Sequence, residues 1–361
     1  METNSTFDKR SLGYIPHLDG LRAVAVILVM LTHANFQLGK SGIIGVQMFF
    51  SLSGFLITTL LLEEYHKHRN VSLKAFYVRR FFRLIPPLLL LLCFIAILNN
   101  TVFNYQVRDG VNEEILAALF YFYNVAWVWG IGEGLILGHM WTLGVEEQFY
   151  LIWPIILIIF IRLNKTKLLS NLLVLITLLS LILKQVYNNP PLADSLLHES
   201  LIIGCLGGLY RCNYPRLYSS PILALIPMLL LIFFGIFPNS EFHLFVLNGG
   251  SWLIGLLTTI FIISITGNKK SPFFKLFANP TLIYTGKISY SLYLWHVPIF
   301  KLFKWYSPFI PAVSFILKFL VSLILAILTW HFLEKKSIGF GRKISNRILS
   351  TSKNKVSHYF P

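Results

Sequence analysis

Residues 17–38 read HLDGLRAVAVILVMLTHANFQL, a largely apolar run that is interrupted by Asp19, Arg22 and His33. A helix needs about 20 predominantly apolar residues to cross a bilayer. The run therefore predicts a membrane-spanning helix. It follows a polar leader, and no small-residue cleavage site comes after it. We expect it to be retained as the first span and not removed as a signal peptide.

The composition of the whole chain agrees with a membrane protein. Of its 361 residues, 55% are hydrophobic and only 13% are charged, and the mean hydropathy is +0.67. Soluble domains carry about 25% charged residues. These values exclude a soluble globular domain, a disordered chain and a coiled coil. The three cysteines, Cys93, Cys205 and Cys212, have the spacing of neither a disulfide framework nor a metal site, so no bound metal is expected.

Apolar runs recur along the chain and predict an all-α, polytopic transmembrane bundle of about ten spans. The runs cover residues 21–38, 42–62, 84–98, 149–161, 168–186, 196–210, 221–237, 245–266, 283–303 and 312–333.

The net charge of +16 can be explained by topology. If the N-terminus is cytoplasmic and the spans alternate, 23 of the 31 basic residues fall in cytoplasmic segments, and Lys184 is among the five on the outer side. This asymmetry predicts that both termini are cytoplasmic, and it favours the membrane, not nucleic acid, as the partner of the basic residues. Residues 1–338 would form the membrane domain. Residues 339–361 would form a flexible, basic cytoplasmic tail lying against anionic lipid.

Residues 115–129 are apolar and rich in Tyr and Trp. If they crossed the membrane, every later segment would change sides and most later basic residues would lie outside. We therefore expect a re-entrant or an interfacial element here, because Tyr and Trp favour the headgroup region.

Polar side chains inside spans are costly, so they are candidates for function. Arg22 and His33 are eleven residues apart, which in an α-helix is about three turns plus about 20°, so both project from one face. Their axial separation is about 16 Å. Arg22 would lie near the cytoplasmic end, where Asp19 can pair with it, and His33 in the outer half. A structural role for all three is the alternative, although imidazole is also the usual general base near neutral pH.

Four further motifs carry polar residues. Ser51, Ser53 and Gly54 follow Gln47 in the second span, where small residues allow close helix packing. Arg80 and Arg83 share one helix face at the cytoplasmic boundary, where they suit either lipid headgroups or a phosphate-rich ligand. The other two motifs lie at the start of a span: Trp141, Glu146, Glu147 and Tyr150 in one, and Ser289, Tyr290, Tyr293 and His296 in the other.

Taken in order, these motifs resemble the acyltransferase type 3 family. The resemblance rests on Leu-Asp-Gly-Leu-Arg at 18–22 with His33 following, on the Phe-Phe-x-x-Ser-Gly-Phe-Leu-Ile run at 49–57, on Arg-x-x-Arg at 80–83, and on the motifs at 141–154 and 289–296. It covers about residues 15–334. The family consists of polytopic membrane acyltransferases, including bacterial O-acetyltransferases that modify surface polysaccharides and Nod factors.

The resemblance implies roles for individual residues. Arg22 and His33 match the Arg-x10-His motif, whose His is taken as essential for acyl transfer, and Glu146 is expected to orient His33 or to bind the acceptor. Arg80 and Arg83 would meet acyl-CoA. The substrate-binding residues would be Trp141, Tyr150, Tyr290, Tyr293 and His296. Gln47 departs from the acidic residue of many members, which leaves a carboxylate role there open. The chain ends soon after its last span, so we expect members with a fused periplasmic domain to be poor models.

The expected function is therefore transfer of an acetyl group from cytoplasmic acetyl-CoA to a hydroxyl of a cell-surface glycan, such as O-antigen or exopolysaccharide, at the outer face of the bacterial inner membrane. No permanently bound cofactor is expected, and the oligomeric state stays open. The alternative from another class is a transporter or flippase for a lipid-linked sugar, which would also explain the spans and the intramembrane arginine. Transporters often contain inverted repeats, and none is apparent. The motif order also argues against the other large family of polytopic acyltransferases, which uses a buried His and Asn.

Overall fold

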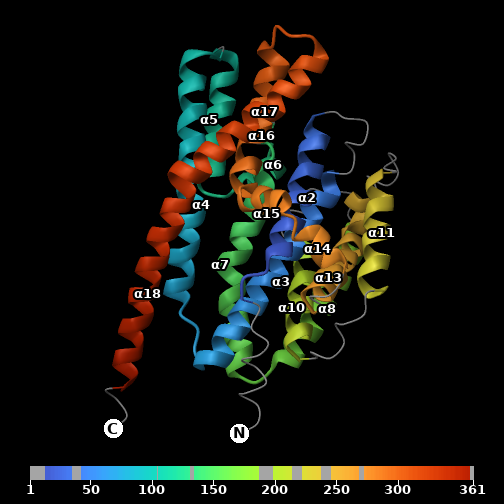
Figure 1. Cartoon of the computed structure of the whole chain (residues 1–361), viewed down its shortest axis with the longest axis vertical. Helices are drawn as coiled ribbons and strands as arrows, with labels where there is room; N and C mark the ends of the chain where they lie inside the picture. Colours follow the sequence, from blue (N-terminus) through green and yellow to red (C-terminus); the bar gives the residue numbers. More distant parts are fainter. Residues whose placement is uncertain are drawn as a thin grey trace. The chain divides into compact units, whose positions relative to one another are not determined.

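The computed structural model describes residues 13–34, 42–103, 105–130, 134–186, 198–213, 222–236, 245–267 and 272–357. These residues form helices and connecting turns, and no strand occurs among them (Figure 1). Parts of the runs predicted at 21–38, 196–210 and 221–237 lie outside the described residues. The all-α prediction is confirmed.

The chain divides into two compact units, and each contains two separate segments of sequence. Unit 1 comprises residues 1–69 and 141–289, and unit 2 comprises residues 70–140 and 290–361. The helices of unit 1 are α2 (Pro16–His33), α3 (Gly42–His68), α7 (Met140–Arg162), α8 (Thr166–Val186), α10 (Glu199–Asn213), α11 (Ile222–Ile236), η3 (Val246–Gly250), α13 (Ser251–Gly267), α14 (Pro272–Phe277) and α15 (Pro280–Lys287).

Glycine allows the helix backbones of unit 1 to touch. A Cβ atom built on Gly54 of α3 would lie 2.1 Å from the carbonyl oxygen of Leu201 in α10, and one on Gly204 of α10 would lie 2.3 Å from that of Ser51. A Cβ on Gly286 of α15 would lie 1.8 Å from the carbonyl oxygen of Asp19 in α2. The predicted packing role of Gly54 is thus confirmed, and small residues set the helix spacing of this unit.

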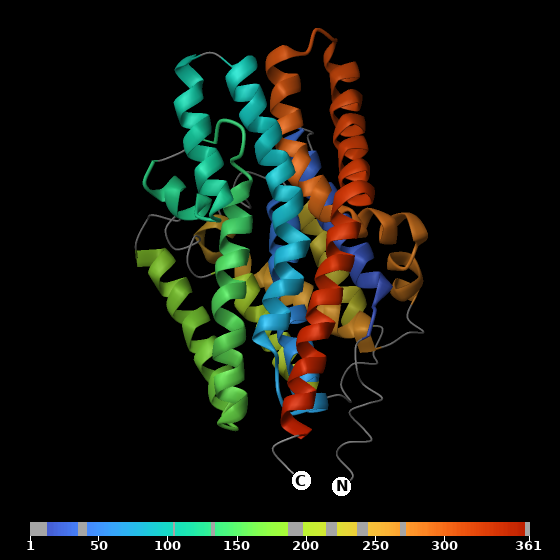
Figure 2. The same ribbon diagram turned by 90° about the vertical axis from the view of Figure 1, so that its left-hand side faces the viewer.

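Unit 2 is helical as well. Its helices are α4 (Leu73–Thr101), α5 (Tyr105–Leu119), α6 (Tyr123–Val128), α16 (Ser289–Tyr306), α17 (Pro311–Thr329), the π-helical turn η4 (Trp330–Glu334) and α18 (Lys335–Ser357). The last three form one continuous helix, and α18 runs beside α4 in both ribbon views (Figures 1 and 2).

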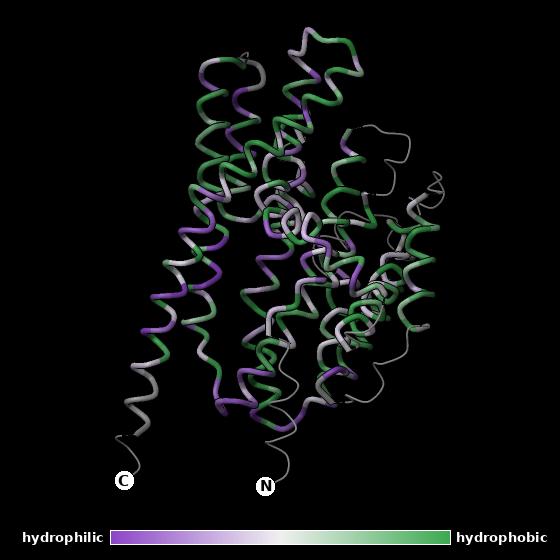
Figure 3. Tube along the Cα trace, in the orientation of Figure 1, coloured by the Kyte–Doolittle hydropathy of each residue, from purple (hydrophilic) through white to green (hydrophobic). Residues whose placement is uncertain are grey.

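The expectation that the tail after residue 338 is flexible is wrong, because α18 continues as a helix to Ser357. Its apolar face packs on α4: the rings of Phe340 and Phe82 lie 5.1 Å apart, and the Arg79 guanidinium donates to the Ser345 hydroxyl at 2.7 Å. Figure 3 shows hydrophilic residues spread along α18, in contrast to the largely hydrophobic α11. A basic composition suggested a solvated tail, but the apolar residues recur with helical spacing.

Five helices are long and apolar enough to cross a membrane. These candidate spans are Gly42–His68, Leu73–Thr101, Met140–Arg162, Thr166–Lys184 and Pro311–Thr351, and Leu223–Gly235 and Ser251–Thr266 are shorter apolar helices. The protein is thus a multi-pass helical membrane protein. Ten spans with both termini cytoplasmic stay a prediction.

Residues 115–129 do not form one helix. The chain leaves α5 at Leu119, turns through Tyr121 with a φ of 55°, and enters the short helix α6. The end of α4 holds α5 through the Asn99 side chain, which donates to the Arg108 carbonyl at 3.1 Å and to the Asn112 side chain at 2.9 Å. Residues 115–129 are not among the candidate spans of the described residues, and their re-entrant or interfacial position stays a prediction.

Candidate active site

The predicted site residues are divided equally between the two units. Unit 1 contains Arg22, His33, Trp141, Glu146 and Tyr150. Unit 2 contains Arg80, Arg83, Tyr290, Tyr293 and His296.

Helix α2 carries Arg22 and His33. Arg22 is half-buried, and its Nη1 donates to Asp19 Oδ1 at 3.1 Å, which confirms the predicted pairing. Asp19 also accepts a hydrogen bond from the Tyr14 hydroxyl at 2.9 Å, and this contact, together with burial, raises the pKa of Tyr14 to about 12. His33 lies in the last turn of α2 and is exposed. The guanidinium is therefore held in place, and the imidazole stands at the other end of the same helix.

Glu146 joins α7 to α3. Its Oε1 accepts hydrogen bonds from the Ser53 hydroxyl of α3 and from the Tyr150 hydroxyl one turn along α7. Two turns beyond Glu146, Trp153 Nε1 donates to the Thr58 hydroxyl at 2.9 Å. The structure thus brings Glu146 and Tyr150 together and adds Ser53. The expectation that Glu146 orients His33 stays a prediction.

Trp141 is part of an aromatic cluster. The His198 ring lies 4.2 Å from the Phe50 ring and 6.3 Å from the Trp141 ring, at an angle of 27° to the indole plane. Phe50 also meets Trp141 edge to face at 6.3 Å. The three rings come from α3, from the start of α7 and from the residue before α10. Because Phe50 lies one turn before Ser53, the same helix carries the aromatic cluster and the partner of Glu146.

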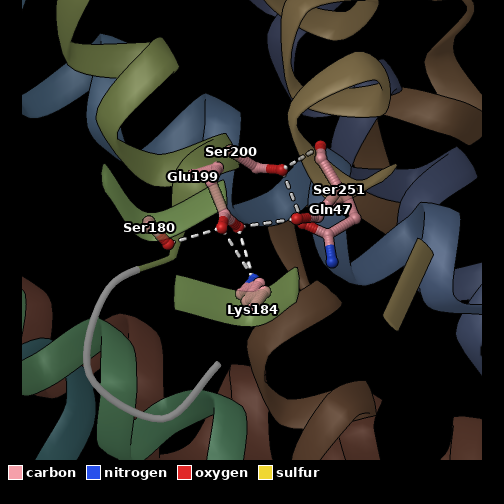
Figure 4. A network of polar contacts seen from close by, with 6 residues as sticks. All are labelled: Gln47, Ser180, Lys184, Glu199, Ser200 and Ser251. Atoms are coloured by element: carbon pink, nitrogen blue, oxygen red, sulfur yellow. Dashed lines mark hydrogen bonds and ion pairs between the residues drawn. The ribbon is translucent and has the colours of Figure 1, made fainter. Parts of the chain in front are cut away.

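An ion pair is buried in unit 1. The Lys184 ammonium of α8 lies 2.7 Å from Glu199 Oε1, and both side chains are completely inaccessible to solvent. The carboxylate also accepts from the Ser180 hydroxyl at 2.6 Å and from the Ser251 hydroxyl at 2.7 Å (Figure 4). Burial of two charges is compensated only when the geometry is good and the remaining lone pairs find donors. Both conditions are met here.

The network continues from α10 to α3. The Ser200 hydroxyl lies 2.5 Å from Gln47 Oε1 and 2.8 Å from the Ser251 carbonyl oxygen (Figure 4). Gln47, where a carboxylate role was left open, thus accepts a hydrogen bond through its amide oxygen, as a carboxylate could. Lys184 was assigned to the outer side of the membrane, and that assignment stays a prediction, but the structure pairs its charge with Glu199 inside the unit. The sequence signal for the two members of this pair was that Lys184 and Glu199 each interrupt an apolar run.

In unit 2, the two arginines lie on α4. Arg80 is half-buried and Arg83 is exposed. The Tyr290 hydroxyl of α16 donates to the Leu84 carbonyl at 2.9 Å, so the start of α16 lies beside the residue that follows Arg83. Tyr290 is thereby placed near one of the residues expected to meet acyl-CoA. The binding of a phosphate-rich ligand by Arg80 and Arg83 stays a prediction.

Tyr293 and His296 join a histidine that the sequence analysis did not select. The Tyr293 hydroxyl donates to the His139 carbonyl at 2.9 Å, and His139 Nε2 lies 3.2 Å from the Leu294 carbonyl oxygen. The rings of His139 and His296 are 5.2 Å apart. His139 lies two residues before Trp141, so the sequence shows that it adjoins the Trp141 motif. Its contact with α16 could not be seen in the sequence.

Glu114 fixes the loop that leads to His139. Its carboxylate accepts from the backbone N–H groups of Leu135, Ile136 and Leu137 at 2.6, 2.9 and 2.8 Å. The Tyr123 hydroxyl donates to the same carboxylate at 2.7 Å, and burial together with this charge raises the pKa of Tyr123. Four donors thus define the path of the chain before His139.

The described residues contain no group of three or more His, Cys, Asp or Glu side chains that could hold a metal ion. The predicted site residues themselves offer imidazole, carboxylate, guanidinium, indole and phenol groups.

Residues 15–331 match the family model described as an acyltransferase domain, and the chain belongs to this acyltransferase type 3 family. The resemblance inferred from the motifs is confirmed. Among individual proteins, the chain is 34% identical over 312 residues to the peptidoglycan O-acetyltransferase OatA of Listeria monocytogenes, which covers 80% of this chain and 50% of that protein.

Two further relatives have similar names. The chain is 31% identical over 349 residues to the O-acetyltransferase OatA of Staphylococcus aureus, with 89% of this chain and 57% of that protein covered. It is 31% identical over 366 residues to the putative peptidoglycan O-acetyltransferase YrhL of Bacillus subtilis, with 93% and 57% covered. The chain spans about half the length of these curated relatives. No solved structure gives a significant match.

Proposed function

We propose that this protein is a membrane O-acetyltransferase that transfers an acetyl group from acetyl-CoA to a hydroxyl of a cell-envelope glycan. The observation that carries the proposal is the combination of family membership with helix α2, which holds Arg22 in an ion pair and presents an exposed His33 eleven residues away. The family match also favours acyl transfer over the transporter or flippase alternative.

Acetyl transfer needs a base that can take the proton of an acceptor hydroxyl. In the direct route, His33 takes this proton, the hydroxyl oxygen attacks the carbonyl carbon of the thioester, and the C–S bond breaks to release the CoA thiolate. In the two-step route, the His33 nitrogen attacks the carbonyl carbon of the thioester, and the C–S bond breaks to release the CoA thiolate. The acceptor hydroxyl oxygen then attacks the acetyl-imidazole, the N–C bond breaks, and the freed imidazole nitrogen takes the hydroxyl proton. Both routes conserve atoms and charge, and both require His33.

The donor and the acceptor would approach from opposite sides of the cytoplasmic membrane. Arg80 and Arg83 offer guanidinium groups for the phosphates of CoA, since arginine binds phosphate through paired hydrogen bonds. Trp141, Glu146 and Tyr150 would contact the acceptor in unit 1. The names of the relatives favour peptidoglycan as the first acceptor to test, ahead of the O-antigen and exopolysaccharide considered from the sequence.

The test is the His33→Ala variant, compared with wild type by the amount of ester-bound acetate on the purified glycan. Loss of a general base or nucleophile is expected to lower the rate by at least about 100-fold. His68→Ala is a matched control, because His68 is an exposed histidine in the last turn of α3, and its acetylation should equal wild type. Unchanged acetylation by a normally inserted His33→Ala protein would refute the role of His33.

The two routes differ in what can be trapped. Purified protein that is denatured in the cold at neutral pH directly after mixing with radiolabelled acetyl-CoA, without acceptor, keeps label only in the two-step route, because an acetyl-imidazole is hydrolysed quickly in acid. The label should be absent from the His33→Ala variant.

A further inference from the structure

His198 carries a nitrogen atom for which the described residues of unit 1 provide no hydrogen bond. The residue is 4% exposed, and its Nδ1 is buried and finds no hydrogen-bond partner among the residues that the structure describes. A buried polar atom without a partner loses its hydration and gains nothing in return. Such an atom in a native protein calls for an explanation, and an absent ligand is one.

The ring cannot easily rotate into a better position. Phe50 and Trp141 lie against it, at 4.2 and 6.3 Å between ring centroids. The His198 carbonyl accepts from the N–H groups of Leu201 and Ile202 at 3.1 and 3.2 Å, which fixes its backbone at the start of α10.

The next residue is fixed more firmly still. Glu199 is held by Lys184, Ser180 and Ser251, from α8 and from the start of α13. A buried ion pair adds little stability relative to an apolar pair of the same size, but it does define one arrangement. In unit 1 that arrangement keeps the imidazole of His198 beside the indole of Trp141.

An aromatic face next to a free hydrogen-bonding group suits one class of ligand. A sugar ring has an apolar C–H face that packs on an aromatic ring, and hydroxyl groups at its edge that need hydrogen bonds. Trp141 is partly exposed, so part of its ring is open to such a ligand. The neighbouring helix turn carries Ser53, which binds Glu146.

We propose that His198 is a binding residue for the acetyl acceptor: Nδ1 hydrogen-bonds a hydroxyl of a sugar that packs against Trp141. The Lys184–Glu199 ion pair is the positioning element that holds the imidazole in place. The inference rests on the proposed function, which it extends by a residue outside all the motifs of the sequence analysis.

The test compares His198→Phe with His198→Asn. Phenylalanine keeps the ring and removes both nitrogens, whereas asparagine places a polar atom close to the position of Nδ1. Loss of one buried hydrogen bond to the acceptor should raise the KM for the acceptor about tenfold in His198→Phe, with kcat and the KM for acetyl-CoA unchanged. His198→Asn should recover most of the wild-type KM.

His66→Phe is the matched control. It makes the same replacement on α3 of the same unit, sixteen residues beyond Phe50, and its side chain packs near Tyr65. Its kinetic constants should equal wild type. An acceptor KM for His198→Phe equal to wild type would overturn the proposal. Equal impairment of His198→Phe and His198→Asn, with a lower unfolding temperature in both, would also overturn it, because it would indicate a structural role.

A binding measurement separates this inference from the proposed reaction. The probe is the disaccharide of N-acetylglucosamine and N-acetylmuramic acid, titrated into purified protein by calorimetry without acetyl-CoA. Binding that is about tenfold weaker in His198→Phe supports the site even if wild type transfers no acetyl group, an outcome that would refute the reaction alone. Equal binding by wild type and His198→Phe would overturn the site and leave the reaction standing.

Discussion

Two buried carboxylates, one in each unit, differ in what they hold. Glu199 and Glu114 are both completely buried. Glu199 accepts from side chains on two other helical elements, Lys184 and Ser180 on α8 and Ser251 at the start of α13. Glu114 accepts mainly from consecutive backbone N–H groups. The first carboxylate therefore ties helices together, and the second shapes a loop.

The comparison teaches how a membrane enzyme can use a costly buried charge. In unit 1 the charge fixes the start of α10, where His198 meets Trp141. In unit 2 it fixes the chain that runs from Leu135 to His139. In each case the carboxylate holds chain that lies within a few residues of an imidazole, His198 in unit 1 and His139 in unit 2, but the parts it immobilises are different. Variants can test this difference directly.

The largest effect is expected for Glu199→Leu, which removes the carboxylate that balances the charge of the buried Lys184 ammonium. Such an uncompensated charge should lower the free energy of unfolding by about 3–5 kcal/mol. The measurement is thermal unfolding of the purified protein in detergent.

The double variant Lys184→Met with Glu199→Leu is the control. Because it removes both charges, its stability should return to within about 1 kcal/mol of wild type, while the KM for the acceptor stays raised if the pair positions His198. A double variant as unstable as the single one would show that the pair is needed for folding itself.

Glu114→Gln should have the next largest effect, about 2–4 kcal/mol, since a carboxylate that accepts from several N–H groups is replaced by an amide with one acceptor oxygen. The loss should be local, so hydrogen exchange of residues 134–139 should become faster while α3 and α10 keep their protection. Glu113→Gln is the matched control, because Glu113 is exposed. Faster exchange throughout unit 1 would contradict the distinction between the two carboxylates.

Gly54→Ala should cost about 1–3 kcal/mol, because the new Cβ would lie 2.1 Å from the Leu201 carbonyl oxygen and force α3 and α10 apart. Gly235→Ala in α11 meets nothing within 4 Å, so it should leave stability unchanged or raise it by up to about 1 kcal/mol. Unfolding temperatures of the two variants provide the comparison, and equal values would argue against backbone contact between α3 and α10.

The smallest effect is expected for Tyr14→Phe, under about 1 kcal/mol, because Tyr14 is mostly exposed and loses one hydrogen bond to Asp19. The neutral phenol is the form that the fold favours, since its pKa is raised to about 12 from an ordinary value of 10.0. The contribution of the Tyr14 hydroxyl to the free energy of unfolding should therefore be complete below pH 10 and disappear as the pH rises through about 12. Unfolding temperatures over this range should converge for wild type and variant. A constant difference would refute the role of the hydroxyl proton.

Interactions within one helix could be predicted from the sequence. Asp19 and Arg22 are three residues apart, so their pairing follows from helical geometry. The small residue Gly54 predicted close packing, although its partner α10 could not be named. The family assignment also followed from motifs, because their order along the chain does not depend on knowing the fold.

Interactions between helices could not be predicted in this way. Lys184 and Glu199 lie on different helices, and nothing in either run indicates that the two would face each other, so Lys184 was counted as an outer charge. His139 was missed because it precedes a helix and lies outside the predicted runs, and His198 was missed because it lies near the start of the run predicted at 196–210 and belongs to none of the motifs. Helix α18 was missed because its basic residues outweighed its apolar face in the composition.

Two polar side chains of α3 have a consequence for how the protein is made. Gln47 and Ser53 enter the membrane early in synthesis, but their side-chain partners come 153 and 93 residues later, in α10 and α7. Until those helices are inserted, the amide of Gln47 and the hydroxyl of Ser53 must find transient partners in their own helix, in water or in the insertion machinery. Unit 1 can therefore close only after α10 has been translated. A ribosome that stalls before α10 would leave α3 exposed to membrane quality-control proteases.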